Sequence, residues 1–272
     1  MTLKYEITGI PHPENPKLFR IRAVRDILSI GVKAGDLGGY IEKESTLSQE
    51  GDCWISDDAR VYGNARIFGN AHIFGNAKIY DNAQVHNTGW VYGEAQVCGA
   101  ALVFDNAQIY GNARVFGRAY IFADARVYGN AKVHGKVRTF GNAQVFGNAQ
   151  VFGNGRVFDN AQVYGDANIT GEVSIHNSAR VFENARISGD IWIYGEAQVF
   201  GAAHVCDAAR VCNNAILNEN MQISGWAYIS STDQIYYSEG VTAFFNKNKK
   251  LVINGGVLSN IEHHKMLARL KL

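Results

Sequence analysis

Histidine is the residue type in this chain best suited to proton transfer, because its imidazole ring titrates near neutral pH. Five histidines lie in the long central part of the sequence: His72, His86, His134, His176 and His204. The spacing places no carboxylate beside any of them, so we expect solvated or stacked rings and predict no catalytic set. If the chain does catalyse a reaction, His86, His134 and His176 are the candidate general bases.

The spacing of potential metal ligands and of the cysteines predicts no functional site either. His263 and His264 are adjacent, and adjacent side chains on a helix diverge, so we predict neither a metal site nor a bound cofactor. The cysteines show no C-x-x-C spacing and are expected to be unpaired thiols in a reducing cytoplasm; they are Cys53, Cys98, Cys206 and Cys212. The net charge of +1 does not indicate a nucleic-acid-binding surface, so no nucleic-acid partner is expected. No apolar run could cross a membrane, so no membrane partner is expected.

The histidines are embedded in a six-residue unit that repeats from Ile55 to Gln234 without insertion or deletion. The unit reads Val-Tyr-Gly-Asn-Ala-Arg at residues 61–66. Its first position is Ile, Val or Leu in every unit except the one that begins at Thr139. A fixed period this short is typical of a solenoid, and it does not match the 3.6-residue period of an amphipathic helix.

Each unit is predicted to form a short strand and a corner. In an extended segment Ala107 and Ile109 point to one side, and Gln108 and Tyr110 point to the other. The Gly-Asn pair that follows tolerates the left-handed backbone conformation of a tight corner. Three units make a triangular coil of about 18 residues, and about ten coils stack roughly 4.8 Å apart around a column of Val and Ile. The predicted fold is an all-β, single-stranded parallel β-helix.

The two ends differ from the repeat. We expect four segments: an N-terminal β cap at residues 1–30, an irregular lead-in coil at 31–54, the repeat at 55–234, and a C-terminal hairpin and helix cap at 235–272. Within the first segment, Gly9–Lys17 holds all three prolines and is expected to be the loop of a β-hairpin.

Two further details concern the lead-in and the C-terminal segment. The spacing from Leu47 to Ile55 exceeds six residues and predicts a bulge before the regular run. Strands are predicted at Val241–Phe245 and Leu251–Ile253, followed by a short helical lid that contains Met266.

The lead-in carries two motifs, G-D-L-G-G-Y at residues 35–40 and L-S-Q-E-G-D-C-W at residues 47–54. Together with the V-Y-G-N-A units, they resemble a group of bacterial and phage-encoded hexapeptide-repeat proteins. The resemblance implies a left-handed β-helix, and one relative with a similar lead-in is assigned as an acyltransferase on its fold alone. Acyltransferases of this fold commonly use a histidine base at a trimer cleft and carry a loop between coils, which this repeat lacks.

A period of 18 sorts the outward residues into columns, two of which are largely aromatic: one begins at Phe74, and the other begins at Phe68 and has further large side chains beside it. Such a column can be a stacking ladder that only stiffens the sheet, or an apolar face that meets a partner, and the sequence leaves both open. The predicted interface residues are Phe68, Leu102, Phe104, Tyr120, Phe122, Phe140, Phe158, Trp192 and Tyr194.

Three functions follow from these patterns. The first is a non-enzymatic structural or interaction protein that forms a homo-oligomer, dimer or trimer, through a flat face or binds a protein partner. The second is an acyltransferase, which rests on fold analogy alone. The third is a phage ligand-sequestering module in which aromatic rings stack on a nucleotide base and Arg or Lys holds its phosphate.

Overall fold

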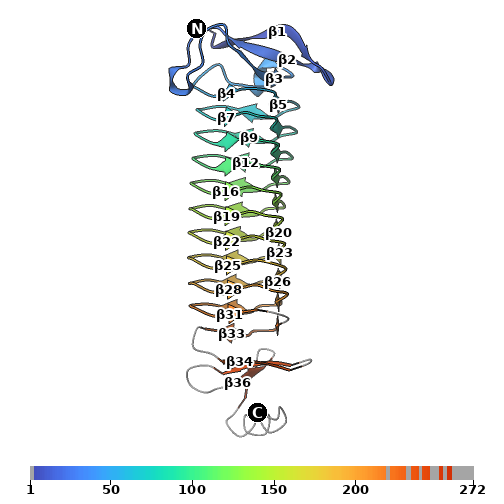
Figure 1. The fold of residues 1–272 in the computed structure, drawn as a ribbon, viewed down its shortest axis with the longest axis vertical. Coiled ribbons are helices and arrows are strands. Elements are labelled where there is room, and N and C mark those ends of the chain that lie inside the picture. Colours follow the sequence, from blue (N-terminus) through green and yellow to red (C-terminus); the bar gives the residue numbers. More distant parts are fainter. Residues whose placement is uncertain are drawn as a thin grey trace. The chain divides into compact units, whose positions relative to one another are not determined.

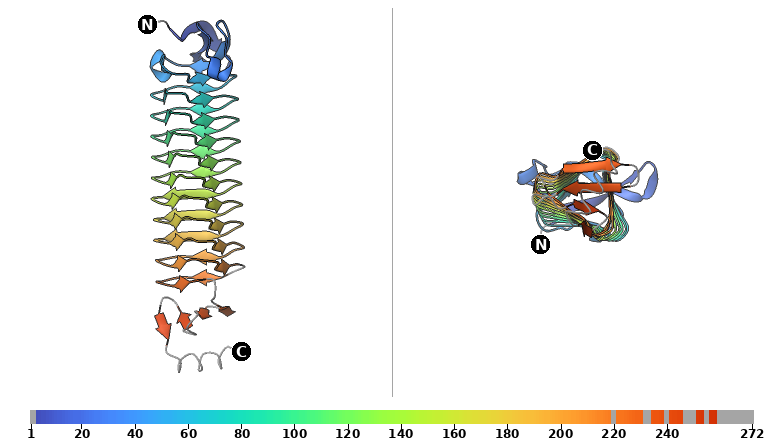
Figure 2. Two further views of the ribbon diagram at one scale, coloured as in Figure 1. Left: turned by 90° about the vertical axis from the view of Figure 1, so that its left-hand side faces the viewer. Right: turned by 90° about the horizontal axis from the view of Figure 1, so that it is seen from below.

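A computed structural model describes residues 3–218 and 221–230 in full, and residues 234–238, 241–245, 251–253 and 256–258 as backbone strands. The chain divides into two compact units, Met1–Gly147 and Asn148–Leu272. Both are built almost entirely from β-strands, and in both the coils stack as a parallel β-solenoid (Figures 1 and 2). The predicted all-β, parallel β-helix fold is confirmed, while its left-handed winding remains an implication of the resemblance.

Unit 1 contains three sheets, which we name A1, B1 and C1. Sheet A1 runs in the order β1 (Tyr5–His12), β2 (Asn15–Ala23), β3 (Leu37–Ile41), β5 (Arg60–Val61), β8 (Lys78–Ile79), β11 (Gln96–Val97), β14 (Arg114–Val115) and β17 (Lys132–Val133). Sheet B1 contains β4 (Trp54–Ile55), β7 (His72–Ile73), β10 (Trp90–Val91), β13 (Gln108–Ile109), β16 (Arg126–Val127) and β19 (Gln144–Val145). Sheet C1 contains β6 (Arg66–Ile67), β9 (Gln84–Val85), β12 (Leu102–Val103), β15 (Tyr120–Ile121) and β18 (Arg138–Thr139). Two short 3-10 helices are present: η1 (Leu28–Ile30) lies at the end of the N-terminal segment, and η2 (Glu44–Thr46) lies in the lead-in.

Unit 2 repeats this plan in sheets A2, B2 and C2. Sheet A2 contains β20 (Gln150–Gly153), β23 (Asn168–Gly171), β26 (Arg186–Gly189), β29 (His204–Val205) and β32 (Gln222–Ile223). Sheet B2 contains β22 (Gln162–Val163), β25 (Arg180–Val181), β28 (Gln198–Val199) and β31 (Ile216–Leu217). Sheet C2 contains β21 (Arg156–Val157), β24 (Ser174–Ile175), β27 (Trp192–Ile193), β30 (Arg210–Val211) and β33 (Tyr228–Ile229).

Parallel backbone ladders join each coil to the next. The amide of Tyr92 donates to the carbonyl of Ile109 at 2.9 Å, and the amide of Asn112 donates to the carbonyl of Gly129 at 2.7 Å. The corners use the left-handed region as the sequence predicts, with φ of 69° at Gly111 and 55° at Asp105. Strand and corner amides are therefore both satisfied by the neighbouring coil.

The predicted core is confirmed in both units. The Val and Ile residues at the first position of each unit are buried, as are the Ala residues two positions before them. Thr139 takes an inward position as well, and its Oγ1 atom is buried without a hydrogen-bond partner. A column of aliphatic side chains thus fills each coil, with one polar interruption.

The N-terminal hairpin is confirmed, but its predicted loop is wrong. Strand β1 extends to His12 and the antiparallel β2 begins at Asn15, so a two-residue turn replaces the loop expected over Gly9–Lys17. Proline is tolerated here because β1 is the edge strand of sheet A1 and its register is interrupted on both sides of Pro11. The hairpin lies at the end of unit 1, next to the coil that contains β4 and β5 (Figure 1).

The lead-in follows the repeat with a bulge, as predicted. Ile41 pairs with Val61 and Leu47 bridges to Ile67. Gly39 packs so closely that an added Cβ would lie 2.4 Å from Cγ2 of Ile55. The glycines of G-D-L-G-G-Y therefore serve the transition from hairpin to coil.

Unit 2 ends in antiparallel strands. Strand β34 (Gln234–Ser238) pairs with β35 (Val241–Phe245), β35 with β36 (Leu251–Ile253), and β36 with β37 (Gly256–Leu258). The predicted hairpin of β35 and β36 is confirmed. The predicted helical lid and the pair His263 and His264 lie outside the described residues.

Candidate binding site

His86 lies in a ring stack of sheet C1. Its ring centroid lies 4.6 Å from that of Phe68 and 5.1 Å from that of Phe104, with nearly parallel planes. Its Nδ1 atom lies 3.1 Å from Oδ1 of Asn87. Both faces of the imidazole are covered by rings, so this histidine is positioned by stacking.

The other two candidate bases are also stacked. His134 lies 4.4 Å from the ring of Phe116, and burial, followed by the charge of Lys132, lowers the pKa of His134. In unit 2, Nδ1 of His176 lies 4.0 Å from Oδ2 of Asp159, beyond hydrogen-bond distance. Burial lowers the pKa of His176 against the opposing effect of Asp159. The neutral imidazole is thus favoured at both positions.

The outer face of sheet C1 combines a ring stack with two large side chains in the neighbouring row, the half-buried Leu102 and the exposed Tyr120. The centroids of Phe104 and Phe122 are 5.0 Å apart, and those of Phe122 and Phe140 are 4.9 Å apart. Beside the stack, Leu102 pairs in register with Tyr120, which is 36% exposed. The predicted interface residues of unit 1 therefore share one face.

A polar rim borders this face at the following corner. The side-chain amide of Asn87 donates to Oδ1 of Asp105 at 2.8 Å, and that of Asn106 donates to Oδ1 of Asp124 at 3.0 Å. On the strand side, the Arg138 guanidinium carbon lies 5.8 Å from the Tyr120 ring centroid. An apolar strip within a polar rim is the usual composition of a protein–protein interface.

In unit 2, the outer face of sheet C2 contains a hollow of about 600 Å³. The row along its centre is formed by Arg156, Ser174, Trp192 and Arg210, each paired in register with the next. Ser174 is the smallest of these side chains, so the hollow opens above it. The remaining lining residues are Asn154, Phe158, Glu172, Val173, His176 and Asp190.

Aromatic rings form one wall of this hollow, which we call the Ser174 hollow. The ring of His176 is stacked between Phe158 at 4.7 Å and Tyr194 at 5.3 Å. Trp192 stands almost perpendicular to His176, at 79° and 6.2 Å between centroids, and is 45% exposed. The sequence places Phe158, Trp192 and Tyr194 on one face, and the structure brings them together.

The Ser174 hollow is a site that the sequence analysis missed. Its signal is a change in the corner before sheet C2, where Gly-Asn-Ala is replaced by Gly-Asn-Gly, Gly-Glu-Val and Gly-Asp-Ile at residues 153–155, 171–173 and 189–191. The φ angles of Gly153, Gly171 and Gly189 are 99°, 101° and 109°, whereas Gly117 in unit 1 has 72°. Strands β20, β23 and β26 extend through these glycines, so a different corner borders the hollow.

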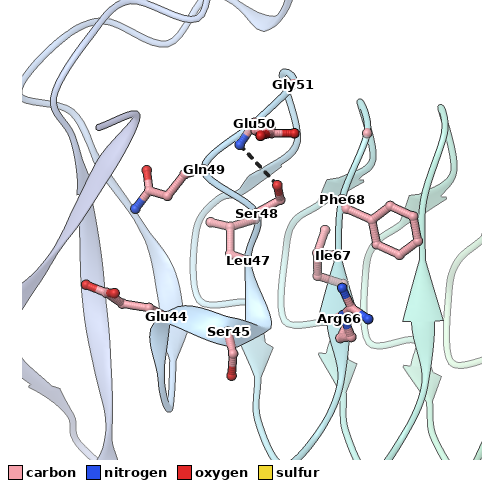
Figure 3. Close-up of a pocket in the computed structure, with 11 residues that line it drawn as sticks. Glu44, Ser45, Leu47, Ser48, Gln49, Glu50, Gly51, Arg66, Ile67 and Phe68 are labelled. Atoms are coloured by element: carbon pink, nitrogen blue, oxygen red, sulfur yellow. Dashed lines mark hydrogen bonds between the residues drawn. The ribbon is translucent and has the colours of Figure 1, made fainter. Parts of the chain in front are cut away.

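A second hollow, of about 700 Å³, lies beside the lead-in bulge of unit 1 (Figure 3). Two of its polar side chains, Gln49 and Ser48, are used by the fold. Gln49 accepts from the amide of Lys4 at 2.8 Å and donates to the carbonyl of Tyr5 at 3.1 Å, and the Ser48 hydroxyl accepts from the amide of Glu50 at 3.0 Å. This hollow is therefore a consequence of the bulge.

Other kinds of site find no support in the part of the chain that the structure describes. That part contains no cluster of three or more His, Cys, Asp or Glu side chains able to hold a metal ion. It also contains no helix long and apolar enough to span a lipid bilayer. The four cysteines are free thiols.

Comparison with known proteins agrees with the fold. No curated protein matches the chain. A family described as the YdcK beta solenoid repeat matches residues 59–75 and 107–121, both within unit 1. The chain is thus a β-solenoid repeat protein that is similar, in these two segments, to the YdcK repeat.

Proposed function

We propose that this chain is a non-enzymatic interaction protein whose C1 outer face binds a second copy of the chain. The observation that carries the proposal is the pairing of Leu102 with Tyr120 beside the parallel ring stack, bordered by a polar rim. Burying such a strip against a partner removes apolar surface from water, which stabilises the complex by about 25 cal/mol per Å².

A second copy fits this face for two reasons. The side chains repeat at a constant spacing set by the parallel strands, so two identical faces can pack in register as an isologous dimer. The net charge of +1 gives little electrostatic repulsion between copies. A homodimer is therefore the simplest occupant of the face.

The proposal is tested by light scattering over a range of protein concentrations. We expect a mass of twice 29.9 kDa for the wild type and a monomer for the variants Leu102→Glu and Tyr120→Lys. Trp90→Lys is the matched control, because Trp90 is an aromatic side chain that is 43% exposed on sheet B1. A wild type that stays monomeric at about 100 μM, or a dimer unaffected by both face variants, would overturn the proposal.

The acyltransferase alternative has less support. His86 has both ring faces covered, and His176 lies 4.0 Å from Asp159, so neither has the hydrogen-bonded carboxylate that commonly orients a catalytic histidine. Calorimetric titration with acetyl-coenzyme A separates the two functions. Saturable binding, together with product formation that His86→Gln or His176→Gln abolishes, would favour the enzyme.

A further inference from the structure

The geometry points to the Ser174 hollow as a binding site for a neutral saccharide, with a sugar ring seated over Ser174 and against Trp192. This inference goes beyond the proposed self-association, because it concerns unit 2 and a different kind of ligand. Its volume of about 600 Å³ lies in the usual range for small-molecule sites.

The hollow is a specific interruption of the repeat. Ser174 takes a position that Leu102 and Tyr120 occupy in sheet C1, so a small side chain leaves a gap on an otherwise filled face. The three modified corners supply Asn154, Glu172 and Asp190 along one side of the same gap. Two independent departures from the repeat thus coincide at one place.

Trp192 supplies the apolar wall. Nearly half of its surface is exposed, and the guanidinium carbon of Arg210 lies 5.7 Å from its ring centroid, which helps to hold the indole in place. The edge of His176 meets the indole from the neighbouring strand. The C–H face of a pyranose ring carries small positive partial charges and packs well against the negative face of an aromatic ring.

The charges around the hollow favour a neutral ligand. Arg156 and Arg210 contribute two positive charges and Glu172 and Asp190 contribute two negative charges, so the formal sum is zero. A phosphate or carboxylate ligand would meet two carboxylates, and a cationic ligand would meet two guanidinium groups. A compact anion such as a nucleotide is therefore disfavoured, although an indole is present for stacking.

The same side chains suit sugar hydroxyls. A hydroxyl group donates one hydrogen bond and accepts others, so it can donate to a carboxylate while it accepts from a guanidinium. Glu172 and Asp190 offer acceptors, Arg156 offers donors, and Asn154 and the Ser174 hydroxyl offer both. Hydrogen bonds to charged groups are stronger than those between neutral groups, and here both carboxylates and a guanidinium group can form them.

The test uses the full chain and a defined probe set. An array of neutral and acidic short oligosaccharides identifies bound sugars, and calorimetry and tryptophan fluorescence then measure their affinity, with ADP in the same panel. We expect at least one neutral oligosaccharide to bind and to change the tryptophan emission. Binding of acidic sugars or ADP alone, or no binding at all, would overturn the inference.

Two variants test the position of the site. Trp192→Ala removes the apolar wall, and Ser174→Gln fills the hollow with the residue type that Gln84 provides on sheet C1. Each is expected to weaken neutral-sugar binding by at least about tenfold. Trp90→Ala is the matched control and is expected to leave the affinity unchanged.

Circular dichroism of each variant checks that it folds. Ser174→Gln is expected to fold because it places at this position a side chain that the repeat already accepts in sheet C1. Neutral-sugar binding that survives both substitutions would also overturn the assignment. Light scattering on the same samples distinguishes the two proposals, because Ser174→Gln is expected to lose sugar binding and to retain self-association through Leu102 and Tyr120.

Discussion

The side-chain nitrogen of Lys4 lies 3.1 Å from Sγ of Cys53, and both side chains are completely buried. The same nitrogen donates to the carbonyl of Cys53 at 2.8 Å, and more weakly to those of Gly51 at 3.3 Å and Glu50 at 3.4 Å. Burial lowers the pKa of Lys4 and raises the pKa of Cys53. Lys4, which immediately precedes strand β1, therefore ties that strand to the lead-in bulge through its side-chain hydrogen bonds.

Replacing Lys4 with Met tests this role. The substitution keeps much of the side-chain volume but leaves buried carbonyls without their donor, so local stability is expected to fall by about 1–3 kcal/mol. Hydrogen–deuterium exchange of the amides in β1 and β2 measures the loss, because exchange reports local opening. Lys17→Met, at an exposed position of β2, is the control and is expected to change exchange little. Equal protection in the two variants would show that Lys4 contributes only through packing.

Thr139 predicts a stabilising substitution. Its Oγ1 atom is buried without a partner in a column that is otherwise aliphatic. Thr139→Val has nearly the same shape and removes the unsatisfied hydroxyl, so we expect a gain of about 1 kcal/mol. The reciprocal substitution Val133→Thr is expected to cost a similar amount. Urea unfolding of the two variants measures both changes, and a loss of stability in Thr139→Val would contradict the account.

Much of this fold follows from local periodicity. The alternation within each unit is enough to place Ile109 in the core and Tyr110 outside, because side chains in a strand alternate between faces. The prediction for Gly9–Lys17 was wrong because Pro11 is accommodated in an edge strand at a bulge and Pro13 in the turn. Local periodicity therefore predicts which face a side chain takes, whereas the place of a strand in the sheet decides whether it accepts proline.

The candidate sites were less predictable. The columns place Leu102 beside Tyr120 from spacing alone, since residues one coil apart are neighbours. The Ser174 hollow depends on two features, a small side chain at one position and a changed corner. In the sequence, both features look like ordinary variation in a repeat. The contact between Lys4 and Cys53 joins two irregular segments, and no period relates them.

Gly39 predicts a large effect from a single methyl group. A Cβ at this position would lie 2.4 Å from Cγ2 of Ile55 and 2.6 Å from the carbonyl oxygen of Ala59. Because the carbonyl belongs to the backbone, Gly39→Ala is expected to destabilise the lead-in by about 1–3 kcal/mol. Thermal unfolding compares it with Gly9→Ala, where an added Cβ would meet nothing within 4 Å. Similar melting temperatures for the two variants would show that the lead-in backbone relaxes around the methyl group.

Three half-buried histidines predict a loss of stability in mild acid. Burial is the largest cause that lowers the pKa of His72, whose Nε2 atom lies 3.0 Å from Oγ of Ser56, and the pKa values of His134 and His176 are lowered as well. The folded state thus favours neutral imidazole. As the pH falls below about 6.5, the unfolded chain takes up protons first, so stability is retained above that pH and decreases below it.

Thermal unfolding at about pH 7.5 and about pH 5.5 measures this effect. The wild type is expected to melt at a lower temperature in the acidic buffer, and His72→Gln is expected to show a smaller difference between the two buffers. Thr139→Val serves as the control, because it removes no titrating group and its stability offset is expected to be the same at both pH values. A wild type that is equally stable in both buffers would show that these imidazoles are protonated in the fold without cost.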